Sequence, residues 1–210
     1  VAGITRRAGI LGRWSAVLAA ALVAGVAHTT PATAASGRSG ACTAADKHAV
    51  TVVIDYQKLG GSIEQYCASN LPAGAVGIDA LRAVGVSTTG TTHDGNGFVC
   101  RLNGRPAAGE PIGIPGDDDY RENCVNTPPA TAYWSYWWAE PGGSWFYSNK
   151  GVLSHRVVFG GYEGWSFAND PEGGYGGDNP APRLKPTAPP TPKPPPRPPA
   201  QPRPKRTVKP

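Results

Sequence analysis

Aromatic side chains with a polar edge gather in one short part of the chain. Five of the six tryptophans lie between residues 134 and 165. Trp and Tyr offer a flat apolar face with a polar edge, so they bind sugars, planar rings and quaternary ammoniums. A binding surface for such a ligand is the first chemistry that this sequence suggests. Its candidate residues are Trp134, Tyr136, Trp138, Trp145 and Tyr147.

A strand through these rings would place them on two faces. Side chains alternate along a strand, so Trp134, Tyr136 and Trp138 share one face, while Tyr133 and Trp137 share the other. One face must pack on the core. The other face either carries large rings toward solvent as a binding surface, or is covered by a helix or loop, which would make this a central strand buried on both sides. The sequence leaves both interpretations open.

Residues that could carry catalysis are scattered. Hydrolysis needs paired carboxylates, or a nucleophile with a base and an orienting group. The one acidic cluster, residues 117–119, follows Gly116 and lacks EF-hand spacing, so we expect a solvated loop rather than a Ca²⁺ site. His48, His93 and His155 lack metal-ligand spacing, and we expect them on the surface. Because P-loop and nucleophile-elbow motifs are absent as well, we expect no enzymatic activity, no metal and no cofactor.

The first 34 residues have the pattern of an export signal. Three arginines, Arg6, Arg7 and Arg13, precede an apolar run over residues 14–27. The uninterrupted part of this run is too short to span ~30 Å of hydrocarbon. An A-x-A pattern of small residues follows it. This pattern predicts a signal peptide over 1–34, cleaved near Ala34, and hence a secreted protein. A buried or anchoring helix and lipidation at Cys42 are the alternatives, and general and twin-arginine export are both open.

The expected export would place the four cysteines in an oxidising compartment. An even count in an oxidising compartment argues for two disulfides, for which three pairings are possible. We expect Cys42–Cys67 and Cys100–Cys124, because each pair is adjacent in sequence and brackets one loop-rich segment. Loops of this length stabilise by about 3 kcal/mol each in the chain-entropy model. A metal or catalytic site is disfavoured, since there is no C-x-x-C spacing and no His beside a Cys.

The charges divide the chain into an acidic middle and basic ends. All 15 acidic residues lie within 46–178, together with only eight Lys and Arg, so this part carries −7 and nucleic acid is disfavoured as a partner. Residues 180–210 contain 14 prolines, eight Lys or Arg and no acid. A Gly-rich exit and a disordered basic Pro-rich tail are therefore expected over 171–210, acting as a spacer or adhering to anionic cell-envelope polymers. We expect no transmembrane segment after signal cleavage.

The middle predicts a small, mainly antiparallel α+β domain over residues 42–170. Alternation and apolar content indicate strands in five places: 50–56, 98–103, 131–139, 145–147 and 162–167. Apolar residues at helical spacing predict one short helix over 76–84, which Gly85 ends. A strand, a helix and then a run of antiparallel hairpins indicate a β-grasp-like sheet with the helix on one face.

Several motifs, taken in order, resemble a family of exported proteins of high-GC Gram-positive bacteria. They lie at 98–104, at Cys124 with Pro128-Pro129, and at 132–137, 145–148 and 163–167. The resemblance covers residues 50–167, and that family is similar to the C-terminal β-rich domain of transcobalamin and intrinsic factor. It implies a surface module that captures a ligand for uptake, such as a corrinoid, beside an energy-coupling transporter. This chain lacks the large α-helical partner domain of those carriers.

Two functions remain from different classes. The first is a secreted or cell-surface, non-catalytic module that binds a ring-bearing small molecule or a glycan through its aromatic residues. The alternative is a structural, cell-wall-associated protein with a cationic Pro-rich tether.

Overall fold

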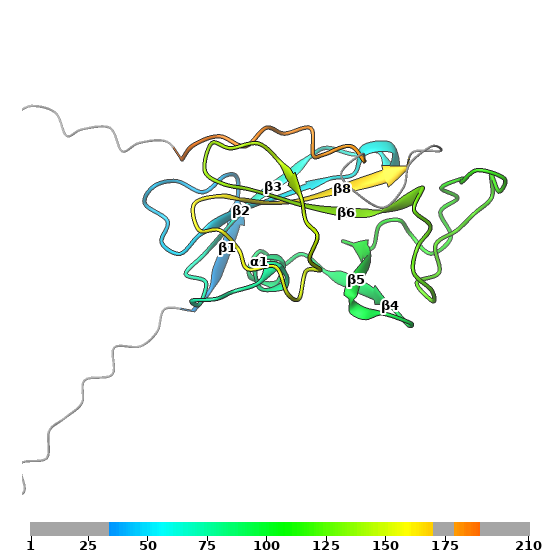
Figure 1. The fold of residues 1–210 in the computed structure, drawn as a ribbon, viewed down its shortest axis with the longest axis horizontal. Helices are drawn as coiled ribbons and strands as arrows, with labels where there is room; N and C mark the ends of the chain where they lie inside the picture. Colours follow the sequence, from blue (N-terminus) through cyan, green and yellow to red (C-terminus); the bar gives the residue numbers. More distant parts are fainter. Residues whose placement is uncertain (1–33, 170–178, 190–210) are drawn as a thin grey trace, which may run out of the picture. The chain divides into compact units, whose positions relative to one another are not determined.

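The computed structural model describes residues 34–169 and 179–189 (Figure 1). Most of the expected signal peptide and most of the expected tail lie outside these residues. The elements are β1 (Ser36–Ser39), β2 (Val50–Asp55), η1 (Gln57–Leu59), β3 (Glu64–Ser69), α1 (Gly77–Ala83), β4 (Thr88–Thr91), β5 (Gly95–Leu102), β6 (Ala132–Ala139), β7 (Phe146–Tyr147) and β8 (Tyr162–Asn169). The described part is thus mainly β with one short helix, which confirms the α+β class.

Six strands form one mixed sheet in the order β1-β3-β2-β8-β6-β7, and β4 pairs with β5 in a second sheet. The hairpins β2-β3 and β6-β7 are antiparallel, and β8 pairs antiparallel with β6 along its whole length. In the centre, however, β8 runs parallel to β2. The expected run of antiparallel hairpins therefore closes on a parallel pair, in which the first and last strands of the β-grasp-like core lie side by side.

The helix α1 forms at the expected place because a hydrogen bond stabilises its start and its apolar residues face the sheet. The Asp79 carboxylate accepts the backbone N–H of Val76 at 3.0 Å, which satisfies a donor at the helix start. Ile78 and Leu81 are buried against the sheet. A Cβ at Gly77 would overlap the Tyr136 hydroxyl oxygen, so a glycine allows the helix to approach β6 this closely.

Both faces of the large sheet are covered. On one face, apolar residues of β2 pack with α1, Trp134, Trp165 and Phe167 in the main core. On the other face, Val53, Ala139 and Tyr162 form a second cluster with partly buried neighbours that include Trp145 and Leu184. Consequently β6 is buried on both sides, as the 3% and 5% exposure of Tyr133 and Trp137 shows. Of the two interpretations left open by the sequence, the doubly covered central strand is the one observed.

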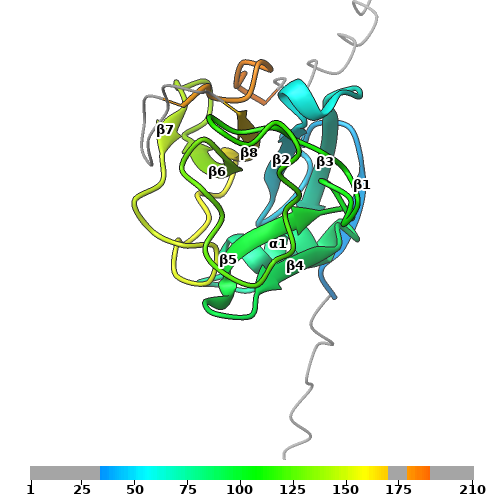
Figure 2. The same cartoon turned by 90° about the vertical axis from the view of Figure 1, so that its right-hand side faces the viewer.

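Residues 179–189, which the sequence assigned to the tail, cover the second face. Figures 1 and 2 show this segment on one side of the sheet, opposite α1 and the β4–β5 hairpin. The Trp145 indole donates to the backbone oxygen of Leu184 at 2.8 Å, and the hydroxyls of Tyr162 and Thr187 are 3.0 Å apart. The sheet likewise begins at Ser36, before the expected domain start at Cys42. The packed domain therefore draws on chain from outside the expected 42–170.

The strongest contact of this segment is an ion pair between Asp55 and Arg183. Asp55 is 0% exposed, and Arg183 reaches it with a 2.6 Å contact from Nη2, while the Arg183 backbone N–H donates at 2.7 Å. Burial alone would raise the pKa of the Asp55 carboxyl. The hydrogen bonds from Arg183 and Gln57 outweigh burial, and the pKa lies below its usual value.

Candidate functional site

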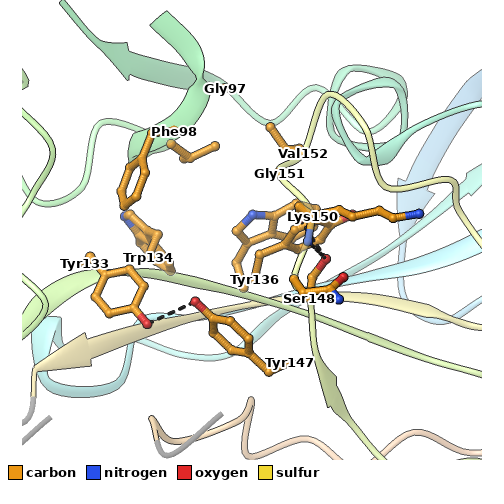
Figure 3. Close-up of a pocket in the computed structure, with 13 residues that line it drawn as sticks. Gly97, Phe98, Tyr133, Trp134, Tyr136, Tyr147, Ser148, Lys150, Gly151 and Val152 are labelled. Atoms are coloured by element: carbon orange, nitrogen blue, oxygen red, sulfur yellow. Dashed lines mark hydrogen bonds between the residues drawn. The ribbon is translucent and has the colours of Figure 1, made fainter. Parts of the chain in front are cut away.

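A cavity of about 380 Å³ lies beside β6, close to where β7 ends (Figure 3). Within the described residues, β7 pairs only with Trp137 and Trp138, and a loop over residues 147–152 continues past the earlier part of β6. The start of β5 supplies the facing wall, over residues 97–99. The short pairing of β7 thus leaves room at this sheet edge, and two neighbouring elements enclose that room.

Aromatic rings form about half of the wall. They come from the four strands β5 to β8: Phe98, Tyr133, Trp134, Tyr136, Tyr147 and Trp165. Figure 3 shows the labelled rings among them arranged around a common space. Such a lining suits a flat ring, since aromatic faces pack on planar apolar groups and on the apolar face of sugars.

The rings in the wall are held in place before any ligand arrives. The Trp134 indole donates to the backbone oxygen of Arg105 at 2.9 Å and meets Tyr56 and Phe167 edge-on. Tyr136 stacks on Trp165 with ring centroids 4.7 Å apart and an interplanar angle of 15°. Because these side chains are already ordered, a ligand would not pay for freezing them.

Polar groups stand among the rings: three hydroxyls, the Asn149 amide and the Lys150 ammonium. The hydroxyls of Tyr133 and Tyr147 are 3.3 Å apart, and Asn179 donates to the Tyr133 hydroxyl at 2.8 Å. The Ser148 hydroxyl donates to the Lys150 backbone oxygen at 2.8 Å. Lys150 is the only charged residue among those that line the cavity in the described part of the chain. The wall is therefore apolar with a few polar points, as in typical small-molecule sites.

A buried polar group lies behind the wall. The Tyr136 hydroxyl donates to the carboxylate of Glu163, which is 0% exposed, and His155 Nε2 lies 3.5 Å from Glu163 Oε1. Burial raises the pKa of Glu163, although the contacts with His155 and Tyr136 act in the opposite direction. Burial also raises the pKa of Tyr136, and the neighbouring Glu163 adds to this effect. The phenol and the acid are thus both held toward their neutral forms.

The structure brings three of the five expected binding residues to the cavity. Trp134, Tyr136 and Tyr147 line it. Trp138 is half-buried and lies beside Phe146 and His155 instead. Trp145 packs on Tyr162 and on the 179–189 segment, in the cluster on the second face of the sheet. The five residues therefore do not form one continuous surface.

Sequence reasoning missed several wall residues and misplaced one histidine. Phe98 and Trp165 were assigned to strands only, because nothing in their local pattern says that β5 and β8 meet beside β6. Lys150 lies in a loop where its type carries no signal. The expectation that His155 lies on the surface is wrong, since it is buried between Tyr136 and Trp138. Its burial follows from its contacts with two rings of the aromatic strand β6, which lies far from it in sequence.

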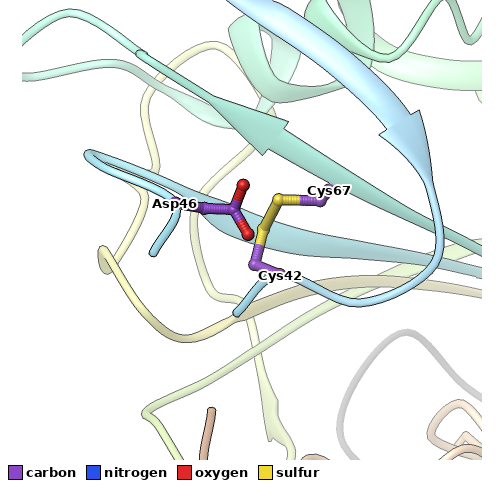
Figure 4. A group of neighbouring side chains, drawn as sticks. All are labelled: Cys42, Asp46 and Cys67. Atoms are coloured by element: carbon purple, nitrogen blue, oxygen red, sulfur yellow. A yellow bond between two sulfur atoms is a disulfide. The ribbon is translucent and has the colours of Figure 1, made fainter. Parts of the chain in front are cut away.

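The cysteines form the expected pairs, Cys42–Cys67 and Cys100–Cys124. A carboxylate lies near each pair, as Figure 4 shows for Asp46 beside the first disulfide. Metal binding by cysteine requires a thiolate, and sulfurs joined in a disulfide have none. Asp46 instead accepts the Thr43 backbone N–H at 2.7 Å, which lowers its pKa. The two disulfides are compatible with an extracellular protein.

Comparisons with known proteins add no identity. No family model, no curated protein and no solved structure matches this chain. Within residues 34–169 and 179–189, no helix is long and apolar enough to cross a membrane.

Proposed function

We propose that this chain is a secreted, non-catalytic module that binds a ring-bearing small molecule in the cavity beside β6. The observation that carries the proposal is the set of six aromatic side chains around one preformed cavity. Soluble domains bury most of their large rings in a filled core, and an unfilled aromatic cavity is the usual form of a ligand site.

The size of the cavity limits the ligand. About 380 Å³ corresponds to about a dozen waters at ~30 Å³ each, which is enough for one sugar ring or a bicyclic aromatic. A corrinoid is a macrocycle with many side groups, so only one part of it could enter. If the resemblance to cobalamin carriers extends to function, this domain would hold one edge of the corrinoid, and uptake would require a second protein.

Binding is tested by calorimetry with three probes: 2-naphthamide, methyl N-acetylglucosaminide and cyanocobalamin. We expect at least one of them to bind the secreted chain, residues 35–210. We also expect Tyr147→Ala and Phe98→Ala to weaken that binding roughly tenfold each, because each removes one ring from the wall.

The matched control is Phe146→Ala. Phe146 neighbours Tyr147 on β7, is 52% exposed and does not line the cavity, so its removal should leave affinity unchanged. Thermal unfolding of each variant separates loss of binding from loss of folding. Absence of binding by all three probes, or equal losses in Phe146→Ala and Tyr147→Ala, would contradict the proposal.

A second function is favoured by the C-terminal sequence. Residues 190–210 carry six Lys or Arg and no acid, and they follow directly on a segment that Arg183 fixes to the sheet. We propose that this basic stretch tethers the domain to anionic polymers of the cell envelope. The two functions are compatible, because Arg183, which fixes the segment before the basic stretch, does not line the cavity.

A further inference from the structure

Resting on the proposed function, we infer that the ligand is a planar ring compound that bears a carboxylate. The aromatic wall by itself would accept a neutral sugar, a flat aromatic or a quaternary ammonium equally well. The polar groups at the wall bear on this choice: Asn149 can donate or accept, whereas the two groups considered next, at Trp165 and Lys150, are donors only.

The first donor is the indole N–H of Trp165. This residue lines the cavity and is only 1% exposed, and no other described residue accepts a hydrogen bond from its indole. The indoles of Trp134, Trp137 and Trp145 have acceptors, and among the described residues only the half-buried Trp138, outside the cavity, is like Trp165 in having none. The Trp165 nitrogen is not among the fully buried atoms without a partner, so it is open to the cavity and can donate to a ligand that brings an acceptor.

The second donor is the ammonium group of Lys150. Among the residues that the structure describes, no carboxylate lines the cavity and no acid forms an ion pair with Lys150. In Figure 3 its ammonium points away from the Tyr133 and Tyr147 rings, but its flexible stem begins at the cavity and can turn inward. An aromatic cage for a cationic ligand would carry an acid at this position rather than a lysine.

The rest of the wall is consistent with an anion. Within the described part of the chain, the Tyr147 hydroxyl has one hydrogen-bond partner, the Tyr133 hydroxyl, so it can still make a bond to a second ligand oxygen. The Glu163 carboxylate is fully buried behind Tyr136, and one of its oxygens accepts the Tyr136 hydroxyl. This arrangement is notable because residues 46–178 carry −7 overall. The described wall of the cavity thus contains no acid, although the domain as a whole is acidic.

The test compares three probes that share one ring system and differ in charge: 2-naphthoate, 2-naphthamide and 2-(aminomethyl)naphthalene. Calorimetry on the secreted chain should show that the carboxylate binds roughly tenfold more tightly than the amide, and that the amine binds most weakly. The affinity for the carboxylate should fall as salt is raised, while that for the amide should not.

Variants assign the preference to the two donors. Lys150→Gln should weaken 2-naphthoate roughly tenfold and leave 2-naphthamide unchanged, whereas Lys58→Gln, an exposed lysine outside the cavity, should change neither. Trp165→Phe keeps a ring but loses the N–H, so it should weaken both the acid and the amide. Because Trp165 lies in the core, its variant is compared only if its melting transition remains cooperative.

The outcomes separate the two proposals. If the amide binds as tightly as the carboxylate, or if Lys150→Gln leaves the carboxylate unaffected, the inference about charge is overturned while the cavity function stands. If none of the naphthalene, sugar or corrinoid probes binds, the proposed function itself fails. Tightest binding by the amine would point to a cationic ligand and would also overturn the inference.

Discussion

At the scale of single residues, Glu163 should make stability depend on pH. Its pKa is raised by burial, so the folded state prefers the neutral acid. The stability that it contributes is complete below the unfolded value near 4.5 and is lost as pH rises through the raised folded value. We expect Glu163→Gln to gain stability over the native chain as pH rises from 4 to 7, by more than the ~0.5 kcal/mol typical of surface substitutions. Urea unfolding at several pH values measures this difference.

The comparison needs a carboxylate that is not buried. Glu140 is exposed and lies one residue beyond β6. The free energy of unfolding of Glu140→Gln should change with pH in the same way as that of the native chain. Asp55 has the opposite effect on stability, because its pKa is lowered in the folded state. The stability that it contributes is present above pH 3.8 and is lost as pH falls further. If the free energy of unfolding of Glu163→Gln also follows that of the native chain at every pH, the buried carboxyl does not titrate as inferred.

What could be predicted at this scale depended on how far a residue's partners lie along the chain. Aromatic residues on the strands β6 and β7 can be recognised by type and spacing, and Trp134, Tyr136 and Tyr147, which line the cavity, were predicted as binding residues in this way. Trp165 reaches the cavity only because β8 pairs with β6 about thirty residues away. No local pattern contains that pairing, so its role was not visible in the sequence.

At the scale of elements, residues 179–189 act as an outer layer of the sheet. Arg183→Ala would leave the fully buried Asp55 carboxylate without its ion pair, which is a costly arrangement in a protein interior. We expect this variant to melt several degrees below the native chain. We also expect chymotrypsin to cleave more readily after Leu184, because the segment would be released from the sheet. Differential scanning calorimetry and timed proteolysis measure the two effects.

Lys185→Ala is the matched control for stability. Lys185 lies two residues from Arg183 and is exposed, and no described residue forms an ion pair with it. Its melting temperature should stay within about 1 °C of native. Equal melting temperatures for Arg183→Ala and Lys185→Ala would show that the segment does not hold the second face of the sheet.

Elements with strong periodicity were predictable, and those without it were not. The strand at β2, the aromatic strand at β6 and the helix α1 appear within a residue or two of their expected ends. The edge strand β1 has the sequence Ser-Gly-Arg-Ser and is exposed along its length, so only its pairing with β3 makes it a strand. Similarly, proline-rich composition indicated disorder for 179–189, but Arg183 has a specific partner on the sheet.

At the scale of the whole molecule, the disulfides stabilise the domain, and acidic and basic residues lie in different parts of the chain. The disulfides tie loop-rich segments to β3 and β5, so the small domain gains stability that its core need not supply. The described residues that line the cavity include no acid, and the basic residues lie largely outside the acidic part in sequence. Long-range attraction to an anionic surface would therefore act on the C-terminal residues rather than on the domain.

This division predicts how the protein partitions. Deleting residues 190–210 should reduce co-sedimentation with cell walls isolated from a Gram-positive bacterium, while leaving 179–189 and the fold intact. A second variant replaces only the six basic residues by Gln, at Lys193, Arg197, Arg203, Lys205, Arg206 and Lys209. It keeps the prolines and the length, so it separates electrostatic adhesion from a spacer. We expect both variants to behave alike and native binding to weaken with salt. Retention of wall binding by the Gln variant would refute the electrostatic tether.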